Sequence, residues 1–366
     1  MAAKIKLLEL CLSPDLGGLE LYMMRAAKAL SEEMDVISVI SPKGKLESYY
    51  KETPHRYEMV EKGSNLLMFG AAKKLAKIID DHSIDVVHLH WTKDIPIAVL
   101  AKKLSKQKPK LVQTRNMNMT RFKDDFYHRF LYQNIDMMLP VTQRVAEQIK
   151  KFVPDAIRPR VELLYMGTDI IDGMSEKERG TFRVEQKMEQ TFAVGMVGRI
   201  EEHKGQHLLI EAIVALENVS AFFVGHEMVE GYTETLKEQA KHLGVEERVH
   251  FLGFMKNPMH FMQACDAMVL ATPCETFGLV VIEAMSVGTP MIATKACGPL
   301  EIIEDGVSGM LFEDQDINAL RQKIELLSSN SELHRALSAE AVTVVHQRFN
   351  TQVQFEKLRE LIGSMF

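Results

Sequence analysis

Two carboxylates in the segment TPCETFGLVVIEAMSVGTP could accept hydrogen bonds from the hydroxyl groups of a ligand. Glu275 and Glu283 are separated by seven residues. The apolar run at 267–271 predicts a buried strand, and 279–287 has the composition of a helix that Gly288 ends. We therefore expect Glu275 in the loop after the strand and Glu283 about one turn inside the helix.

The start of this predicted helix favours an anionic ligand. Gly278 removes a side chain at the bend, and the backbone N–H groups near Phe277, Gly278 and Leu279 lack partners within the helix. A helix N-terminus carries roughly half a positive charge, which attracts phosphate. Phosphate on these N–H groups, with carboxylates beside it, suits a sugar nucleotide. The alternative is a helix cap and a solvated face.

The stretch ETFGLVVIEAM resembles the donor-site signature of the retaining glycosyltransferases of family four, which belong to the GT-B superfamily. That signature has two glutamates separated by seven residues, with Phe-Gly-Leu after the first and Glu-Ala-Met at the second. The resemblance implies that Glu275 grips hydroxyls of the donor sugar and acts in catalysis. It also implies that Glu283 binds the ribose hydroxyls, and that neither glutamate is a covalent nucleophile.

Two cations follow another predicted strand, FAVGMV at 192–197. Arg199 comes directly after Gly198, and Lys204 precedes Gly205 at the start of the next helix. A leaving diphosphate needs fixed cations when no metal ion is present. The pair matches the diphosphate-binding pair of family four in order and spacing, which implies donor-binding and catalytic roles for both. The alternative is that both side chains are solvated.

Gly17 and Gly18 lie between a predicted strand and a predicted helix at 19–30, where glycine lets backbone approach a ligand closely. The alternative is a tight turn without a ligand. The pair resembles the N-terminal glycine loop of the family. The resemblance implies a donor-binding role for Gly18, and an acceptor-binding role for Gly17.

His88 and His90 lie at the end of a predicted strand, and the period of two places them on one face. Either could be a core histidine with its hydrogen bonds satisfied. The resemblance favours His90, since the family often places a histidine here that points at the transferred sugar and touches the acceptor site. Arg115 follows the next strand, where relatives often carry another histidine. We expect it to hold an anionic acceptor group or the donor phosphates, unless it is a surface arginine.

Strand-like and helix-like segments alternate along the chain, which predicts an α/β protein with parallel sheets. The predicted elements are 4–12, 19–30, 36–40, 66–79, 86–89, 96–104, 111–114, 126–134, 137–139, 161–164, 192–197, 221–225, 232–243, 249–253, 267–271, 279–287, 291–294 and 299–303, followed by a mostly helical stretch at 317–366.

The resemblance implies the GT-B fold, in which two Rossmann-like domains with parallel sheets face a cleft. We expect an acceptor-binding domain at 1–170, a linker at 171–190 and a nucleotide-sugar-binding domain at 191–345. A C-terminal helix at 346–366 is expected to pack back on the first domain. At 366 residues the chain is long enough for two domains of average size.

The net charge of −6 gives no case for nucleic-acid binding. The stretch 101–123 nevertheless contains eight basic residues and no carboxylate, which favours contact of the N-terminal half with anionic lipid or a phosphorylated acceptor. A solvated basic face is the alternative. The first twelve residues are too short and polar for a secretion signal, and no apolar run approaches about 20 residues. We expect a cytoplasmic protein at the inner face of the membrane.

The four cysteines show no CxxC or Cys/His pairing, so we expect reduced, buried thiols. Cys274, beside Glu275, is a weaker candidate for a nucleophile. No metal is expected, since the one Asp-x-Asp spacing, 314–316, lies near the C-terminal helices. No cofactor is expected apart from a nucleoside diphosphate sugar as co-substrate, with UDP as the expected nucleotide.

The interpretation that follows is retaining transfer of a hexose-type sugar to a glycan or lipid-linked acceptor, in lipopolysaccharide or capsule synthesis. The alternatives are a GT-B phosphorylase or epimerase, and a non-catalytic protein that senses sugar nucleotides. A Rossmann oxidoreductase is disfavoured because no G-x-G-x-x-G fingerprint follows the first strand.

Overall fold

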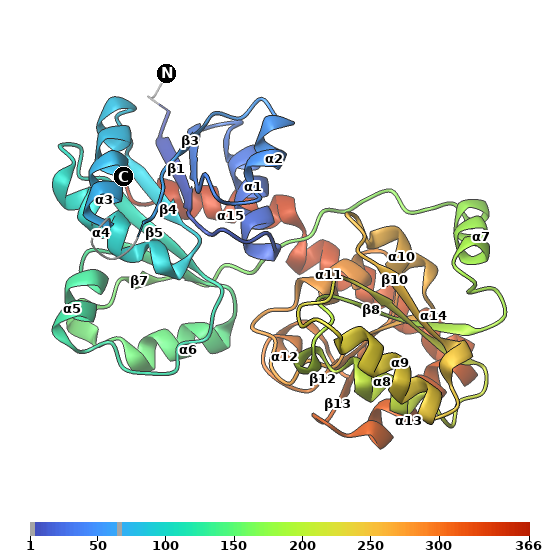
Figure 1. Cartoon of the computed structure of the whole chain (residues 1–366). Coiled ribbons are helices and arrows are strands. Elements are labelled where there is room, and N and C mark those ends of the chain that lie inside the picture. The colour runs from blue at the N-terminus through green and yellow to red at the C-terminus, as the bar shows by residue number, and fades with distance from the viewer. Residues whose placement is uncertain (1–3, 64–67) are drawn as a thin grey trace. The chain divides into compact units, whose positions relative to one another are not determined.

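The chain divides into two compact units, each built on one parallel sheet (Figure 1). The computed structural model describes residues 4–63 and 68–366. One unit comprises Met1–Tyr165 with Gln352–Phe366, and the other comprises Met166–Thr351. Residues 66 and 67 of the helix predicted at 66–79 lie outside the described residues. The predicted architecture of two Rossmann-like halves is confirmed.

The first unit has a seven-stranded sheet in the order β3-β2-β1-β4-β5-β6-β7. Its strands are β1 (Lys6–Cys11), β2 (Asp35–Ile40), β3 (Tyr57–Met59), β4 (Val86–Leu89), β5 (Lys110–Arg115), β6 (Met137–Pro140) and β7 (Arg160–Val161). Its helices are α1 (Gly18–Leu30), α2 (Glu47–Lys51), α3 (Met68–Asp81), α4 (Ile95–Leu104), α5 (Phe126–Tyr132), α6 (Gln143–Phe152) and, from the end of the chain, α15 (Thr351–Gly363).

The second unit has a six-stranded sheet in the order β10-β9-β8-β11-β12-β13. Its strands are β8 (Phe192–Val197), β9 (Val219–Val224), β10 (Val249–Gly253), β11 (Ala267–Leu270), β12 (Met291–Thr294) and β13 (Met310–Phe312). Its helices are α7 (Glu176–Glu185), α8 (Gln206–Ala212), α9 (Tyr232–His242), α10 (Met259–Ala264), α11 (Leu279–Ser286), α12 (Pro299–Ile302), α13 (Ile317–Ser329) and α14 (Ser331–Val344).

Both sheets reverse their strand order at one position. In the first, β2 and β4 flank β1, and in the second, β9 and β11 flank β8. Ligands of open parallel sheets bind beyond the carboxyl ends of the strands at such a reversal. The reversal points therefore place the loop before α1 beside the end of β4, and the loop after β8 beside the loop after β11.

Helix α15, red in Figure 1, is last in sequence but belongs to the first unit. The ring of Phe355 packs on that of Tyr22 with centroids 5.5 Å apart, and Arg359 forms an ion pair with Glu33. Burial of an aromatic ring on α1 is a strong reason for the last helix to dock there.

Helix α7 lies within the stretch expected to be a linker, 171–190. It has no buried residue, and it is held to the second unit by cations. Arg183 forms an ion pair of 3.0 Å with Asp266, and the Nε of Arg179 donates to the carbonyl of Gln263 over 2.9 Å. Because these contacts are polar, the sequence of α7 has no apolar stripe from which the helix could be predicted.

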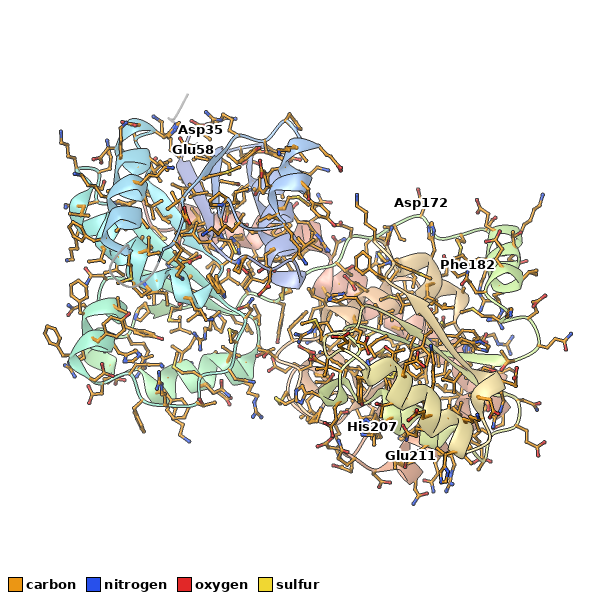
Figure 2. The ribbon with its side chains drawn as sticks, viewed as in Figure 1. Asp35, Glu58, Asp172, Phe182, His207 and Glu211 are labelled. Carbon is orange, nitrogen blue, oxygen red and sulfur yellow. A yellow bond between two sulfur atoms is a disulfide. The ribbon has the colours of Figure 1, made fainter. Side chains whose placement is uncertain are left out.

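Helices α8 and α9 pack side by side through a polar contact. Glu211 of α8 accepts a hydrogen bond of 2.9 Å from the side-chain amide of Gln239, while His207 lies one turn earlier on α8 (Figure 2). This packing fixes the helix that directly follows Lys204. None of the described helices is long and apolar enough to cross a membrane.

Candidate active site

The cation of Lys204 and the carboxylate of Glu275 meet at the reversal point of the second sheet. Lys204 ends the 3-10 turn after β8, Glu275 lies in the loop after β11, and Nζ lies 2.9 Å from Oε2. Both side chains are partly buried, at 18% and 30% exposure. The structure thus joins two residues that lie 71 positions apart in the chain.

Gly205 explains how closely these two loops approach. Its φ is +76°, which favours glycine, and a Cβ there would lie 2.7 Å from the carbonyl oxygen of Ala271. The backbone after Lys204 therefore packs directly on the strand end that leads to Glu275.

Arg199 lies in the same loop as Lys204 but has a different partner. Its guanidinium is half exposed and pairs with Glu201 over 3.0 Å. Its carbonyl accepts a hydrogen bond of 2.8 Å from the side chain of Gln206, whose Oε1 is buried without a partner among the described residues. The loop backbone is thus fixed while the Arg199 cation stays accessible. Glu201 is a site neighbour that the sequence reasoning did not identify.

Helix α11 begins at the predicted position. Gly278 is its N-cap residue with a φ of +100°, a conformation that glycine adopts without strain. Leu279 is the first helical residue, and Glu283 lies in the second turn. Gly288 has a φ of +74° just after the helix, as expected for a helix stop.

Phe277 contributes to this site by packing. Its side chain is 3% exposed, and its ring meets that of Phe349 edge-on with centroids 5.9 Å apart. A buried ring anchors the loop between Glu275 and α11. The donor-binding role expected of Phe277 stays a prediction for its backbone.

The prediction of four reduced thiols is wrong for two of them. Cys274 and Cys297 form a disulfide with Cα atoms 5.4 Å apart, whereas Cys11 and Cys265 are buried and free. The disulfide could not be predicted from the sequence, because the two cysteines are 23 residues apart and belong to no motif. Adjacent strands β11 and β12 bring their following loops together. The bond also leaves no thiol at Cys274 to act as a nucleophile.

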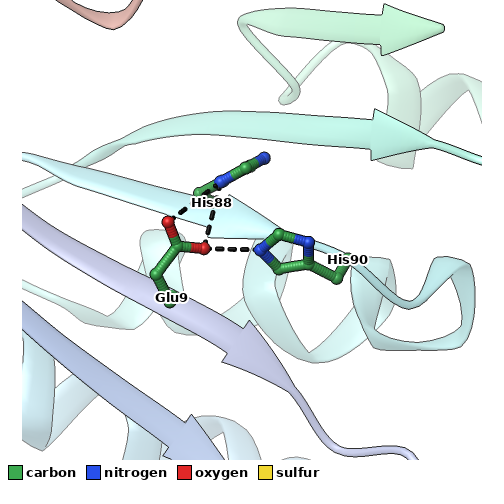
Figure 3. Close-up of side chains that lie close together, drawn as sticks. All are labelled: Glu9, His88 and His90. Atoms are coloured by element: carbon green, nitrogen blue, oxygen red, sulfur yellow. Dashed lines mark hydrogen bonds and ion pairs between the residues drawn. The ribbon is translucent and has the colours of Figure 1, made fainter. Parts of the chain in front are cut away.

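Glu9, His88 and His90 form a buried cluster at the reversal point of the first sheet (Figure 3). Oε2 of Glu9 lies 2.5 Å from Nε2 of His90 and 3.0 Å from Nδ1 of His88. The other nitrogen of His88 lies 2.8 Å from the hydroxyl of Thr114. The two imidazole rings lie on one face as predicted, with centroids 4.2 Å apart.

The ionisation of this cluster fixes the tautomer of His90. Burial raises the pKa of Glu9, but the two imidazoles outweigh burial and bring the pKa to about 2. Burial, reinforced by His88, lowers the pKa of His90 to about 4. An ionised carboxylate can only accept, so His90 donates from Nε2 and is otherwise neutral. Its Nδ1 is a buried acceptor with no partner among the described residues.

A metal ion could also use this cluster. The ligand atoms of Glu9, His88 and His90 all lie within 4.8 Å of one another, and two imidazoles with one carboxylate suit zinc. The hydrogen bonds among the three side chains satisfy the same atoms directly.

Asp316, from the predicted Asp-x-Asp spacing, caps α13 by accepting a hydrogen bond from the N–H of Ala319.

The glycine pair lies at the start of α1, where Gly17 is the N-cap residue and Gly18 the first helical residue. The N–H of Gly17 donates to the carboxylate of Glu20 over 2.9 Å. Gly17 has an extended φ of −160°, and a Cβ there would meet no atom closer than 3.6 Å. The conformation therefore does not itself require glycine at 17.

Arg115 is not the surface arginine that was one of two expectations. It is 6% exposed, and burial lowers the pKa of its guanidinium. The guanidinium donates to the carbonyls of Met117 and Asn118 and to the hydroxyl of Thr92, at 2.8, 2.9 and 3.1 Å. These bonds hold the loop after β5. Binding of an anionic acceptor by Arg115 stays a prediction.

The sequence reasoning missed Glu9, although a signal was present. Glu9 interrupts the run of apolar residues that follows Lys6 in the strand KLLELC, and it is fully buried. A charge in a buried strand needs partners from neighbouring strands. His88, directly opposite on β4, supplies one.

Comparisons with known proteins agree with this arrangement. Residues 178–343 match the family Glycosyl transferases group 1, and residues 16–170 match Glycosyltransferase Family 4. The structure resembles that of HepE from Anabaena in complex with UDP and glucose, with a TM-score of 0.86, 23% identity, and coverage of 98% of this chain and 100% of HepE. These findings define a glycosyltransferase with the GT-B fold.

Two curated relatives are similar in sequence. The lipopolysaccharide core biosynthesis glycosyltransferase LpsE of Rhizobium meliloti is 28% identical over 168 residues, and this match spans 46% of this chain and only 48% of LpsE. The capsular polysaccharide biosynthesis glycosyltransferase CapM of Staphylococcus aureus is 23% identical over 351 residues, or 91% of this chain and 90% of CapM. Models of glycosyltransferase families thus match both halves of the chain.

Proposed function

We propose that the protein transfers a hexose-type sugar, with retention of configuration, from a UDP-sugar to a glycan or lipid-linked acceptor in cell-surface polysaccharide synthesis. The relatives LpsE and CapM act in lipopolysaccharide core and capsule synthesis, and HepE was crystallised with UDP and glucose. The proposed localisation is the cytoplasm, at the inner face of the membrane.

The contact between Lys204 and Glu275 carries this proposal. Nζ and Oε2 lie 2.9 Å apart beside the start of α11, so a cation, a carboxylate and a helix N-terminus converge within one unit. A diphosphate would bind Lys204, Arg199 and the backbone near Gly278, since all three supply positive charge. Once the diphosphate replaces Glu275 as the partner of Lys204, the carboxylate of Glu275 would accept hydrogen bonds from the sugar.

The remaining roles follow from the same chemistry. Glu283 would bind the ribose hydroxyls, and Gly18 the distal phosphate. His90 would accept a hydrogen bond from a hydroxyl of the transferred sugar at its buried Nδ1, which lacks a partner among the described residues. The two cations would stabilise the leaving UDP, so we propose that transfer proceeds without a resident metal.

We further propose that the first unit contacts an anionic membrane through the loop before α5 and the start of that helix. Phe122 and Phe126 are 63% and 88% exposed, and Met117 and Tyr127 are about half exposed. Arg121 and Lys123 lie among these apolar side chains in sequence. Exposed aromatic groups beside basic ones suit the interface of an anionic bilayer. Lys102 is not available, because it pairs with Asp136 over 2.6 Å.

The test of the proposed activity is a thermal-shift panel of UDP-, GDP- and ADP-sugars, followed by hydrolysis assays of each ligand that binds. We expect a UDP-sugar to stabilise the wild type and to release UDP slowly. Lys204→Ala should weaken binding at least tenfold. The matched control is Lys237→Ala, which breaks an exposed ion pair with Glu234 on α9.

Three results would contradict the proposal. They are no binding of any sugar nucleotide, turnover that requires free phosphate, and complete loss of turnover in chelator that metal restores. Phosphate dependence would indicate a phosphorylase instead.

A further inference from the structure

The disulfide lies directly against the carboxylate loop of the second unit. Cys274 immediately precedes Glu275, and Cys297 immediately precedes Gly298. The N–H of Gly298 donates a hydrogen bond of 2.8 Å to the carbonyl of Glu275. The sulfur bridge and this hydrogen bond therefore join the same two loops at adjacent positions.

The two loops are in close backbone contact around this bridge. A Cβ at Gly298 would lie 2.2 Å from the carbonyl oxygen of Phe277, so the loops touch without intervening side chains. Cys297 itself has a φ of +56°, which a residue with a side chain rarely adopts. Such a conformation persists only where surrounding bonds enforce it, and the bridge to Cys274 is one of those bonds.

The other two cysteines differ from this pair. Cys11 and Cys265 are free, and burial raises the pKa of both thiols above its usual range. A thiol that resists ionisation is a poor nucleophile and reacts slowly. Cys274 is half-buried, whereas Cys297 is 6% exposed, so Cys274 is the more accessible residue of the pair. Of the four cysteines, Cys274 and Cys297 are therefore the pair on which redox chemistry would act.

We propose that Cys274 and Cys297 are a reversible redox pair that sets how firmly the Glu275 loop holds the donor sugar. The inference rests on the proposed function of Glu275. In the oxidised protein the bridge holds the loop ready for the ligand, whereas reduction lets the backbone at Cys297 leave its left-handed conformation. Binding must then order the loop, which lowers donor affinity.

The reaction is a thiol–disulfide exchange with a small thiol such as glutathione. A thiolate attacks the sulfur of Cys274, the bond to Cys297 breaks, and Cys297 leaves as a thiolate that takes a proton. A second small thiol releases Cys274 as a thiol and forms the small-molecule disulfide. Two electrons and two protons pass to the protein, and oxidised glutathione drives the reverse reaction.

The experiment compares the full chain after treatment with oxidised or reduced glutathione. Alkylation and mass spectrometry should find two free thiols in the oxidised protein and four in the reduced protein. We expect reduction to lower the thermal midpoint and to raise the KM for the UDP-sugar about fivefold. Cys297→Ser should match the reduced wild type in both conditions, and Cys274→Ala provides a second variant if Cys297→Ser folds poorly. Cys265→Ala is the matched control and should keep the wild-type response.

Two results would overturn the inference. One is recovery of four free thiols after oxidation, and the other is an equal donor KM in the two redox states. Failure of the proposed function gives a different pattern, because the thiol count and thermal midpoint would still respond while no UDP-sugar binds in either state.

Discussion

One oxygen of Glu9 contacts Nε2 of His90 at 2.5 Å, and both side chains are fully buried between β1 and the end of β4. The contact fixes the donor side of the imidazole and leaves Nδ1 as an acceptor. Glu9 therefore acts on a ligand only through His90, as a positioning residue.

Glu9→Gln should lower kcat about tenfold, or about 1.4 kcal/mol, and leave the donor KM within about twofold. An amide no longer enforces one tautomer, because it can donate as well as accept. Nitrogen NMR of the imidazole should show a single Nε2–H tautomer in the wild type and a mixture in the variant. The matched control is Glu58→Gln, which removes an exposed carboxylate 2.7 Å from His82. A single unchanged tautomer in Glu9→Gln would contradict the role.

His90 should make stability depend on pH between 7 and 5. Burial lowers its pKa to about 4 in the folded state, against 6.5 in the unfolded chain. The unfolded state therefore binds the proton first, and stability from this group is present above about pH 6.5 and lost as the pH falls toward 4. Relative to His90→Gln, the wild type should lose about 2 kcal/mol from pH 7 to 5. Urea unfolding in the presence of a chelator measures the difference, and parallel curves for the two proteins would refute the prediction.

Glu275→Gln should reduce kcat/KM at least a hundredfold, about 2.7 kcal/mol, because a neutral amide supports developing positive charge poorly. The site is a loop, so the thermal midpoint should stay within about 2 °C of the wild type. Steady-state UDP release measures the effect. Glu313→Gln, which breaks an exposed pair with Lys295, is the matched control. Retention of full activity in Glu275→Gln would remove the residue from catalysis.

Gly298→Ala should disturb the packing between the loop that contains Gly298 and the loop that contains Glu275. The new Cβ would lie 2.2 Å from the carbonyl oxygen of Phe277, and backbone atoms cannot rotate away as a side chain can. We expect a loss of about 2 kcal/mol in unfolding free energy and weaker donor binding. The control is Gly180→Ala on α7, where a Cβ meets no atom within 4 Å. Equal stability of the two variants would show that the loops separate easily.

The double change Phe122→Ser and Phe126→Ser should weaken flotation with vesicles of phosphatidylglycerol and phosphatidylcholine about tenfold. Two exposed rings would no longer enter the interface, while the basic side chains remain. Phe366→Ser, at a ring that is 69% exposed, is the matched control. Vesicle binding that changes neither with salt concentration nor in the double variant would contradict the proposed membrane contact.

Local sequence patterns were sufficient to predict most of the helices and strands and the order in which the candidate site residues follow them. Apolar strands such as FAVGMV and the helix stop at Gly288 follow from local rules of burial and backbone freedom, so both were predicted close to their observed positions. The spacing of Glu275 and Glu283 likewise depends only on neighbours in the chain. Helix α7 was not predicted, because ion pairs rather than an apolar stripe hold it in place.

Contacts between residues that are far apart in the chain depend on how the strands are arranged in each sheet. Strand order at the two reversal points joins Lys204 to Glu275 and Glu9 to His90, and the adjacent strands β11 and β12 bring Cys274 to Cys297. Pairing between strands is set by the packing of the whole sheet, and no local pattern encodes it. Burial within the tertiary structure also lowers the pKa of His90 and withdraws Arg115 from the surface.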